Sequence, residues 1–210
     1  MSPKQDTGLD PDELGDIVKE GYNVIAGKYY QDRDLFKNKE QIDDFIKHLP
    51  EDAVVLDIGC GGGVPVLKTM IEHGFTAKGI DFSKEMLALA EKNVPEAELI
   101  LGDVMKTDFE PESIDGIIST YAIIHIHRSY HPSLYQKIFS WLKSGGVMMV
   151  STARTDWEEV HDYYGVQMAW SHPAARESLQ MVVNTGFEVI YEKLVTTGDE
   201  TPYWIFAKKP

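Results

Sequence analysis

Acidic residues and glycines stand at two points of the chain in an arrangement that suits the binding of a nucleoside. Asp57 ends a short apolar run, and segment 59–63 after it is rich in glycine. The apolar run suits a buried strand, and the glycines let the backbone turn sharply and approach a ligand. A second apolar run ends in Asp81, about 20 residues beyond the glycines, where a βαβ unit delivers a carboxylate to a ribose. The first hypothesis is therefore a cofactor that contains a nucleoside.

The glycine segment also indicates which kind of nucleoside. A dinucleotide fingerprint requires glycine at its first, third and sixth positions, and Gly59 and Gly61 fit, but the sixth position is Val64. The carboxylate of Asp57 would repel a pyrophosphate and would suit a nearby cation such as an amino-acid ammonium. The Gly-Lys-Ser/Thr of a P-loop does not follow the glycines. The segment favours a nucleoside with a positively charged tail, with a nicotinamide-dependent oxidoreductase as an alternative.

These residues must be positioned by alternating strands and helices. The pattern predicts helices from near Pro11 and at 39–48, 64–73, 84–93 and 132–143, and strands at 53–58, 76–81, 98–102, 114–119 and 146–152. We expect Asp10 to cap the first helix and Ser83 to cap the helix at 84–93. The alternation predicts an α/β fold with a doubly wound parallel sheet and helices on both faces. Two final runs, 187–196 and 202–208, predict an antiparallel hairpin at the sheet edge.

Five motifs, VLDIGCGGG, GIDFS, LGD, IDGIISTYAIIHI and LKSGGVMMVST, occur in this order across roughly residues 20 to 152. This set resembles the class I S-adenosylmethionine (SAM)-dependent methyltransferases that act on small molecules. The resemblance implies a Rossmann-like seven-stranded sheet with the last strand reversed, and SAM as the cofactor. It also implies methyl transfer to an O, N, S or C atom of a small-molecule acceptor. A non-catalytic SAM-binding partner subunit is a further alternative.

The cofactor site follows from the motifs. We expect cofactor binding by Asp57, Gly59, Cys60, Gly61, Asp81, Phe82, Met86, Asp103, Val104 and Thr120. The oxygens of Asp81 should accept the ribose hydroxyls, and the backbone of Gly59 and Gly61 should lie against the cofactor. The resemblance implies that Asp57 faces the methionine ammonium and that Asp103 binds the adenine amino group. Each of these residues also has a purely structural interpretation, as an ordinary turn, cap or core residue.

The acceptor site is predicted from aromatic residues and histidines. Tyr22 and Tyr29 lie seven residues apart, so they share a helix face, and they resemble the Tyr-x-x-x-Ala-x-x-Tyr pattern of small-molecule members. Aromatic faces near a sulfonium are favourable through cation–π attraction, although both tyrosines would also serve to pack the helix. His125 is the first candidate for a base or substrate-orienting residue. The remaining expected substrate residues are Tyr121, Trp170 and His172.

The chain is expected to form one domain with the acceptor covered by a lid. Residues 1–10 are predicted to be a flexible tail, residues 11–50 to form helices that contribute to the lid, and residues 153–173 to be a lid insertion. That insertion is rich in aromatic and ionisable residues. It leaves the carboxyl edge of the predicted sheet, where ligands bind in open α/β folds.

Composition narrows the range of partners. The 34 acidic and 20 basic residues give a net charge of −14, which opposes binding to a nucleic-acid backbone. No apolar run approaches the roughly 20 residues that span a membrane, and the polar N-terminus does not resemble a signal peptide. Cys60, the single cysteine, cannot form an internal disulfide, which suits the cytoplasm. A metal site is not expected, and the oligomeric state is open.

Overall fold

Adjacent residues of the central strands bury their side chains on opposite faces of one sheet. Val55 packs among the helices on one face, whereas Leu56 packs among those on the other. This pattern is expected for a parallel sheet that is covered on both sides. The computed structural model describes residues 7–32, 38–198 and 200–210 of the chain.

The strands of the main sheet are β1 Val54–Ile58, β2 Thr76–Asp81, β3 Glu98–Leu101, β4 Ile114–Ser119, β5 Leu142–Thr152, β8 Glu188–Leu194 and β9 Tyr203–Lys208. They lie in the order β3-β2-β1-β4-β5-β9-β8. Strands β1 to β5 pair in parallel, and β9 runs antiparallel between β5 and β8. The predicted seven-stranded, doubly wound sheet with a reversed last strand is confirmed.

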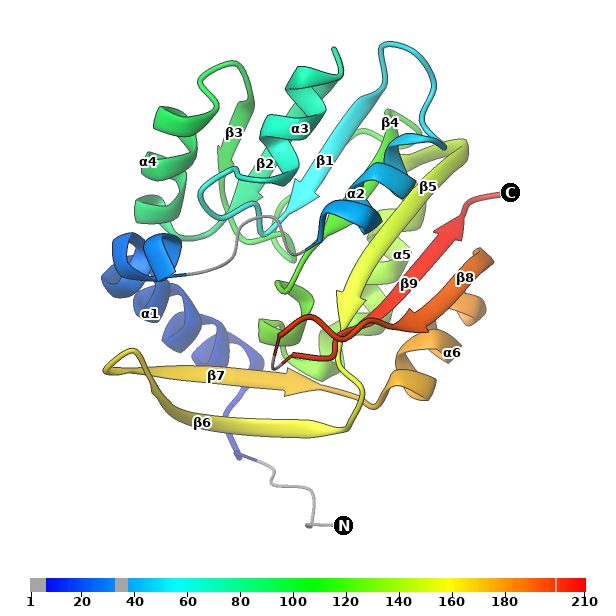
Figure 1. Cartoon of the computed structure of the whole chain (residues 1–210). Coiled ribbons are helices and arrows are strands. Elements are labelled where there is room, and N and C mark those ends of the chain that lie inside the picture. The colour runs from blue at the N-terminus through cyan, green and yellow to red at the C-terminus, as the bar shows by residue number, and fades with distance from the viewer. Residues whose placement is uncertain (1–6, 33–37, 199) are drawn as a thin grey trace.

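Helices cover both faces of this sheet (Figure 1). One face packs against α2 Lys39–Ile46, α3 Val66–Glu72 and α4 Lys84–Asn93. The other packs against α5 His131–Trp141, α6 Ala175–Thr185 and the short 3-10 helix η1 Ile123–His125. A second 3-10 helix, η2 Arg128–Tyr130, leads into α5. The predicted cap of α4 is present, since the Ser83 hydroxyl accepts the Met86 amide N–H at 3.2 Å.

The start of β5 differs from the predicted one. The strand begins at Leu142, directly after α5, whereas the two glycines at 145 and 146 predicted a break before a strand at 146. Leu142 is fully buried and pairs with Ile114 of β4, and the register shifts before Gly116 pairs with Val147. The glycines therefore form an irregularity inside the strand, because the burial of Leu142 keeps the preceding residues on the sheet.

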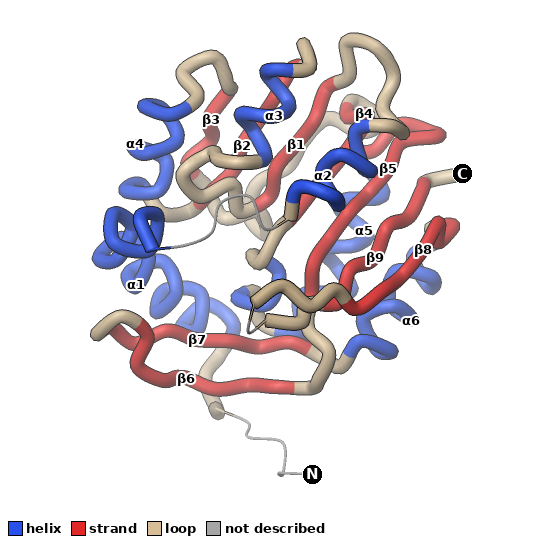
Figure 2. Tube along the Cα trace, in the orientation of Figure 1, coloured by secondary structure: helices blue, strands red, loops and turns tan. Residues whose placement is uncertain are grey.

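Residues beyond β5 form a separate two-stranded hairpin, β6 Trp157–Tyr163 and β7 Val166–His172. Helix α1, Pro11–Asp32, lies along it, and both lie beyond the carboxyl ends of the parallel strands (Figures 1 and 2). The contact is apolar: Leu14, Val18 and Ile25 of α1 form a core cluster with residues 168 and 169 of β7. The predicted insertion at 153–173 thus has regular structure that its sequence pattern did not indicate.

Two sets of hydrogen bonds fix the start of α1, one within the helix cap and one to the hairpin. Asp10 caps the helix as predicted, because its Oδ1 accepts the amide N–H groups of Asp12 and Glu13 at 2.9 Å. Thr7 donates its amide and hydroxyl hydrogens to Glu158 Oε1 of β6, each at 3.1 Å. Residues 1–6 of the predicted tail lie outside the described residues.

Two glycines of α1 test the contact between this helix and the hairpin. A Cβ at Gly21 would meet Met168 Cε at 2.8 Å and the Gln167 carbonyl oxygen at 3.1 Å, whereas a Cβ at exposed Gly27 would meet nothing within 4 Å. Helical Gly→Ala substitution normally stabilises by about 1 kcal/mol. Gly27→Ala should therefore raise the melting temperature, and Gly21→Ala should lower it in thermal unfolding. Equal effects of the two substitutions would contradict the close packing of α1 on β7.

Candidate functional site

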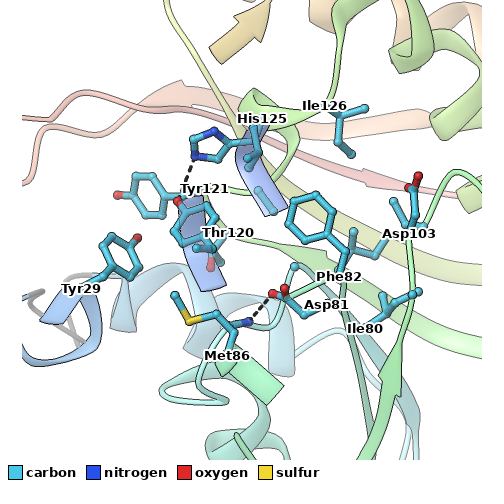
Figure 3. A pocket seen from close by; sticks show the side chains of 18 residues that line it. Tyr29, Ile80, Asp81, Phe82, Met86, Asp103, Thr120, Tyr121, His125 and Ile126 are labelled. Carbon is cyan, nitrogen blue, oxygen red and sulfur yellow. Dashed lines mark hydrogen bonds between the residues drawn. The ribbon is translucent and has the colours of Figure 1, made fainter. Parts of the chain in front are cut away.

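A cavity opens at the carboxyl ends of β1, β2 and β4, between these strands and α1 (Figure 3). Its empty space is about 730 Å³, which includes space open to solvent. It is lined by Val18, Tyr22, Tyr29, Ile58, Gly59, Gly61, Ile80, Asp81, Phe82, Met86, Gly102, Asp103, Val104, Thr120, Tyr121, Ala122, His125 and Ile126. Twelve of the predicted site residues therefore meet at one place.

Asp81 lies at the end of β2 and joins two backbone segments. Its Oδ2 accepts the Gly61 amide N–H and its Oδ1 accepts the Ser83 amide N–H, both at 2.9 Å. Burial raises the pKa of this carboxyl group to about 6, against the opposing effect of the amide hydrogen bonds. Each carboxylate oxygen can accept more than one hydrogen bond. The geometry suits a pair of neighbouring hydroxyls such as those of a ribose.

The glycine segment is hydrogen-bonded to β2 and lies close to the segment that follows β4. The Gly59 amide donates to the Ile80 carbonyl at 2.8 Å, and Gly59 has a φ of +70°. A Cβ at this position would meet the Ala122 Cβ at 2.2 Å, so a larger residue is excluded on steric grounds as well as by backbone strain. Glycine at 59 thus lets the loop approach the segment after β4 and leaves the cavity open to a ligand.

Residues that follow β2 and β3 line the end of the cavity next to Asp81. Phe82 and Met86 supply apolar surface, and the Asp103 Oδ1 accepts the Met105 amide N–H at 2.8 Å in the turn after β3. The Ser83 hydroxyl donates to Asn23 Oδ1 of α1 at 2.9 Å, which links this end to the covering helix. The combination of an apolar wall with a carboxylate at its rim suits a heteroaromatic base with an exocyclic amino group.

His125 connects α1, η1 and the hairpin. Its Nδ1 lies 2.7 Å from the Ala169 carbonyl oxygen, which only accepts, so Nδ1 carries the hydrogen. Burial lowers the pKa of His125 to about 4, so the ring is neutral at pH 7. Its Nε2 is then an acceptor, and the Tyr22 hydroxyl, 3.0 Å away, donates to it. This pair can receive a proton at the Tyr22 oxygen while Tyr22 passes its own hydrogen to His125.

Tyr29 and Tyr121 complete the aromatic side of the cavity (Figure 3). The Tyr29 and Tyr22 rings meet edge to face with centroids 5.4 Å apart, which confirms that they share a face of α1. Tyr121 has a φ of +60°, an unusual conformation for a bulky residue. Its amide N–H donates to the Ser151 hydroxyl at 2.7 Å and its own hydroxyl donates to Asn38 Oδ1 at 3.3 Å, so both ends of the residue are held.

Four predicted site residues do not line the cavity. Asp57 is buried within β1, and the Cys60 thiol packs into the core, where a Cβ at Gly79 would meet its Sγ at 2.8 Å. Trp170 stacks on His161 with centroids 4.2 Å apart, and it also makes a ring contact with His125 of the site. His172 is buried at the end of β7.

The structure also adds lining residues that were not predicted: Val18, Ile58, Ile80, Gly102, Ala122 and Ile126. Helical spacing could have predicted one of them, because Val18 precedes Tyr22 by one helical turn and so lies on the same face of α1. The other five are direct chain neighbours of predicted residues, Ile126 among them because it follows His125.

Fold and cavity together define an α/β protein that binds a nucleoside at the carboxyl edge of a Rossmann-like sheet. Residues 55–146 match the family model described as a methyltransferase domain. The matched residues make up less than half of the chain; together with the methyltransferases below, the match supports the family, the enzyme class and the cofactor predicted from the motifs.

Two curated relatives and one solved structure illustrate this similarity. The chain is 25% identical to the phosphoethanolamine N-methyltransferase of Plasmodium falciparum, over 94% of this chain and 75% of that protein. It is 26% identical to the sterol 24-C-methyltransferase of Clavispora lusitaniae, over 92% of this chain but only 60% of that protein. The Burkholderia thailandensis 1,6-didemethyltoxoflavin-N1-methyltransferase, solved with 1,6-didemethyltoxoflavin and S-adenosylhomocysteine, has a TM-score of 0.79 at 17% identity and covers 99% of this chain and 93% of its own.

The part of the chain that the structure describes lacks two further features. No helix within 7–32, 38–198 and 200–210 is long and apolar enough to cross a membrane. In the same part of the chain, no group of three or more His, Cys, Asp or Glu side chains is placed to hold a metal ion.

The raised pKa of Asp81 predicts a pH dependence of cofactor binding. Ribose hydroxyls donate to the ionised carboxylate, so a proton competes with the cofactor once the pH falls below about 6. Affinity for SAM, measured by calorimetry, should therefore be constant above pH 7 and fall about tenfold by pH 5. Asp81→Asn cannot ionise and should bind weakly at both pH values. Equal affinity of the unmodified protein at pH 7 and pH 5 would remove Asp81 from this role.

Proposed function

We propose that this protein transfers a methyl group from SAM to a small-molecule acceptor and releases S-adenosylhomocysteine. The observation that carries the proposal is that one cavity joins two different linings. Asp81, the glycine segment and Asp103 form the end suited to the nucleoside, and Tyr22, Tyr29, Tyr121 and His125 form the other. The sulfonium of SAM would lie between them, with its methyl group directed at the aromatic end.

Positioning and exclusion of water account for most of what the protein must supply. The sulfonium is already an activated methyl donor, so the reaction requires an acceptor atom in line with the S–C bond and a dry site. Helix α1 lines the cavity and packs on the hairpin β6–β7, which supports the predicted role of segments 11–50 and 153–173 as a lid. We assign His125, through Tyr22, to orienting the acceptor and accepting a proton from it where the acceptor carries one.

The two alternatives have less support. A nicotinamide-dependent oxidoreductase would need a loop suited to a pyrophosphate, whereas Asp57 is buried directly before the glycine segment. A non-catalytic SAM-binding subunit would not need the enclosed aromatic end of the cavity. We also place the protein in the cytoplasm, since Cys60 is buried as a free thiol and no second cysteine exists.

The relatives leave the acceptor open. Their names give phosphoethanolamine, a sterol and 1,6-didemethyltoxoflavin as acceptors, and these differ in charge, size and methylated atom. The cofactor half of the fold is shared among many acceptors, so the family does not select one.

Calorimetric titration with SAM, S-adenosylhomocysteine and NAD tests the proposal. Both sulfur nucleosides should bind to the purified chain and NAD should not. Asp81→Ala removes two charge-assisted hydrogen bonds and should weaken SAM binding on the order of 100-fold. Asp108→Ala is the matched control, because Asp108 is an exposed acid paired with Lys137 away from the cavity, and it should bind SAM normally. Binding of NAD alone would overturn the assignment.

A further inference from the structure

A second hollow, here called the outer hollow, lies between α1, the start of α4 and the segment after β3. Its empty space is about 1130 Å³, which includes space open to solvent. Three residues of the nucleoside end, Phe82, Gly102 and Asp103, line both this hollow and the cavity, so the two adjoin there. Helix α1 lines the outer hollow with residues that recur every three to four positions on one face, and the last of these is Asn23.

A hydrogen bond to Ser83 fixes the orientation of the Asn23 carboxamide. The Ser83 side chain is buried, and its hydroxyl accepts the Met86 amide N–H and donates its single hydrogen to Asn23 Oδ1 at 2.9 Å. The opposite orientation would place Asn23 Nδ2 against Ser83, and the hydroxyl hydrogen would then lose the acceptor that it has among the described residues. The carbonyl oxygen of the carboxamide therefore faces Ser83, and its nitrogen is turned away from that residue.

The two hydrogens on Asn23 Nδ2 are available to a ligand. In the described part of the chain, the bond from Ser83 is the only hydrogen bond of the Asn23 side chain. Asn23 is also the only carboxamide among the described residues that line either hollow. The lysines that line the outer hollow are each paired with a carboxylate: Lys19 with Asp16, Lys84 with Glu85, and Lys106 with Asp12.

The surroundings of Asn23 indicate which part of a nucleoside it can meet. Its partner Ser83 donates an amide N–H to Asp81, the carboxylate assigned to the ribose, so Asn23 is tied to the sugar side of the site. The carboxylates of Asp81 and Asp103 accept hydrogen bonds and so match the hydroxyls and the amino group of the nucleoside. Ring nitrogens and ribose oxygens are acceptors, and they require a donor such as the Asn23 amide.

We propose that Asn23 donates a hydrogen bond from the lid helix to an acceptor on the sugar side of the bound nucleoside, and so couples binding of the nucleoside to the position of α1. The inference rests on the proposed function, because it takes the nucleoside of SAM as the ligand. Asn23 directly follows Tyr22, which lines the aromatic end of the cavity. A bound cofactor therefore holds the turn of α1 that presents Tyr22 to the methyl acceptor.

Asn23→Asp separates a ligand contact from an anchor for α1 in calorimetric titrations of the full chain with S-adenosylhomocysteine. The carboxylate keeps an oxygen for Ser83 and loses the amide hydrogens, so affinity should fall about tenfold or more. Asn184→Asp is the matched control, because Asn184 of α6 also accepts a hydrogen bond through Oδ1, from Gln180, and lines neither hollow. It should bind within about twofold of the unmodified protein, whereas Asn23→Leu, which adds no charge, should lose about fivefold or more.

An analogue of S-adenosylhomocysteine with carbon in place of ring nitrogen N3 identifies the acceptor atom. If the ring nitrogen accepts, Asn23→Leu should bind this analogue as tightly as the unmodified protein does. If a ribose oxygen accepts, the loss caused by Asn23→Leu should be the same for the analogue. Amide hydrogen exchange measures the coupling: saturation with S-adenosylhomocysteine should slow exchange in residues 11–32, and should slow it less in Asn23→Asp.

Two results would overturn the inference. One is that either Asn23→Asp or Asn23→Leu binds S-adenosylhomocysteine within about twofold of the unmodified protein, which would leave Asn23 as an anchor alone or reduce its effect to charge. The other is equal slowing of exchange in α1 of the unmodified protein and of Asn23→Asp. Failure of the unmodified chain to bind S-adenosylhomocysteine is a different outcome, which would contradict the proposed function itself.

Discussion

The Asp81 carboxylate is the interaction on which the arrangement of the site depends. It accepts an amide from the glycine segment and another from the start of α4, and so fixes two loops that leave different strands. Without that link both amides would lose their acceptor, and only the Gly59 and Cys60 amides, which donate to the Ile80 carbonyl, would still join the glycine segment to β2 among the described backbone hydrogen bonds. The same burial that makes the link effective raises the pKa of the acid to about 6. Loop architecture and cofactor binding are therefore coupled through one side chain.

The aromatic end depends on a different kind of contact, namely between segments that are distant in the chain. Tyr22 and His125 are 103 residues apart, and His125 and Ala169 are 44 apart. They meet only because α1 packs on the hairpin β6–β7 through an apolar cluster and a close approach at Gly21. The orientation of the histidine is thus a result of lid packing as much as of the 3-10 helix η1 that carries it.

This difference explains which parts the sequence predicted. The nucleoside end was predictable because Gly59, Asp81 and Asp103 each sit at the end of a strand, where short motifs determine position. The hairpin was not, since its register depends on contacts with α1. Trp170 was therefore expected at the acceptor, whereas strand alternation turns it toward His161 while its neighbour Ala169 supplies the carbonyl to His125. Whether Trp170 and His172 influence the acceptor stays a prediction.

The partner of His125 on the hairpin is a main-chain carbonyl, and this has an evolutionary consequence. Every amino acid at position 169 carries the same carbonyl group, so substitution there preserves the hydrogen bond provided that the strand keeps its register. The hairpin can then change its side chains, and with them the shape of the lid, without altering the tautomer of the histidine. Side-chain substitutions in this hairpin can therefore change the preference for the acceptor, as long as its backbone keeps the hydrogen bond to His125.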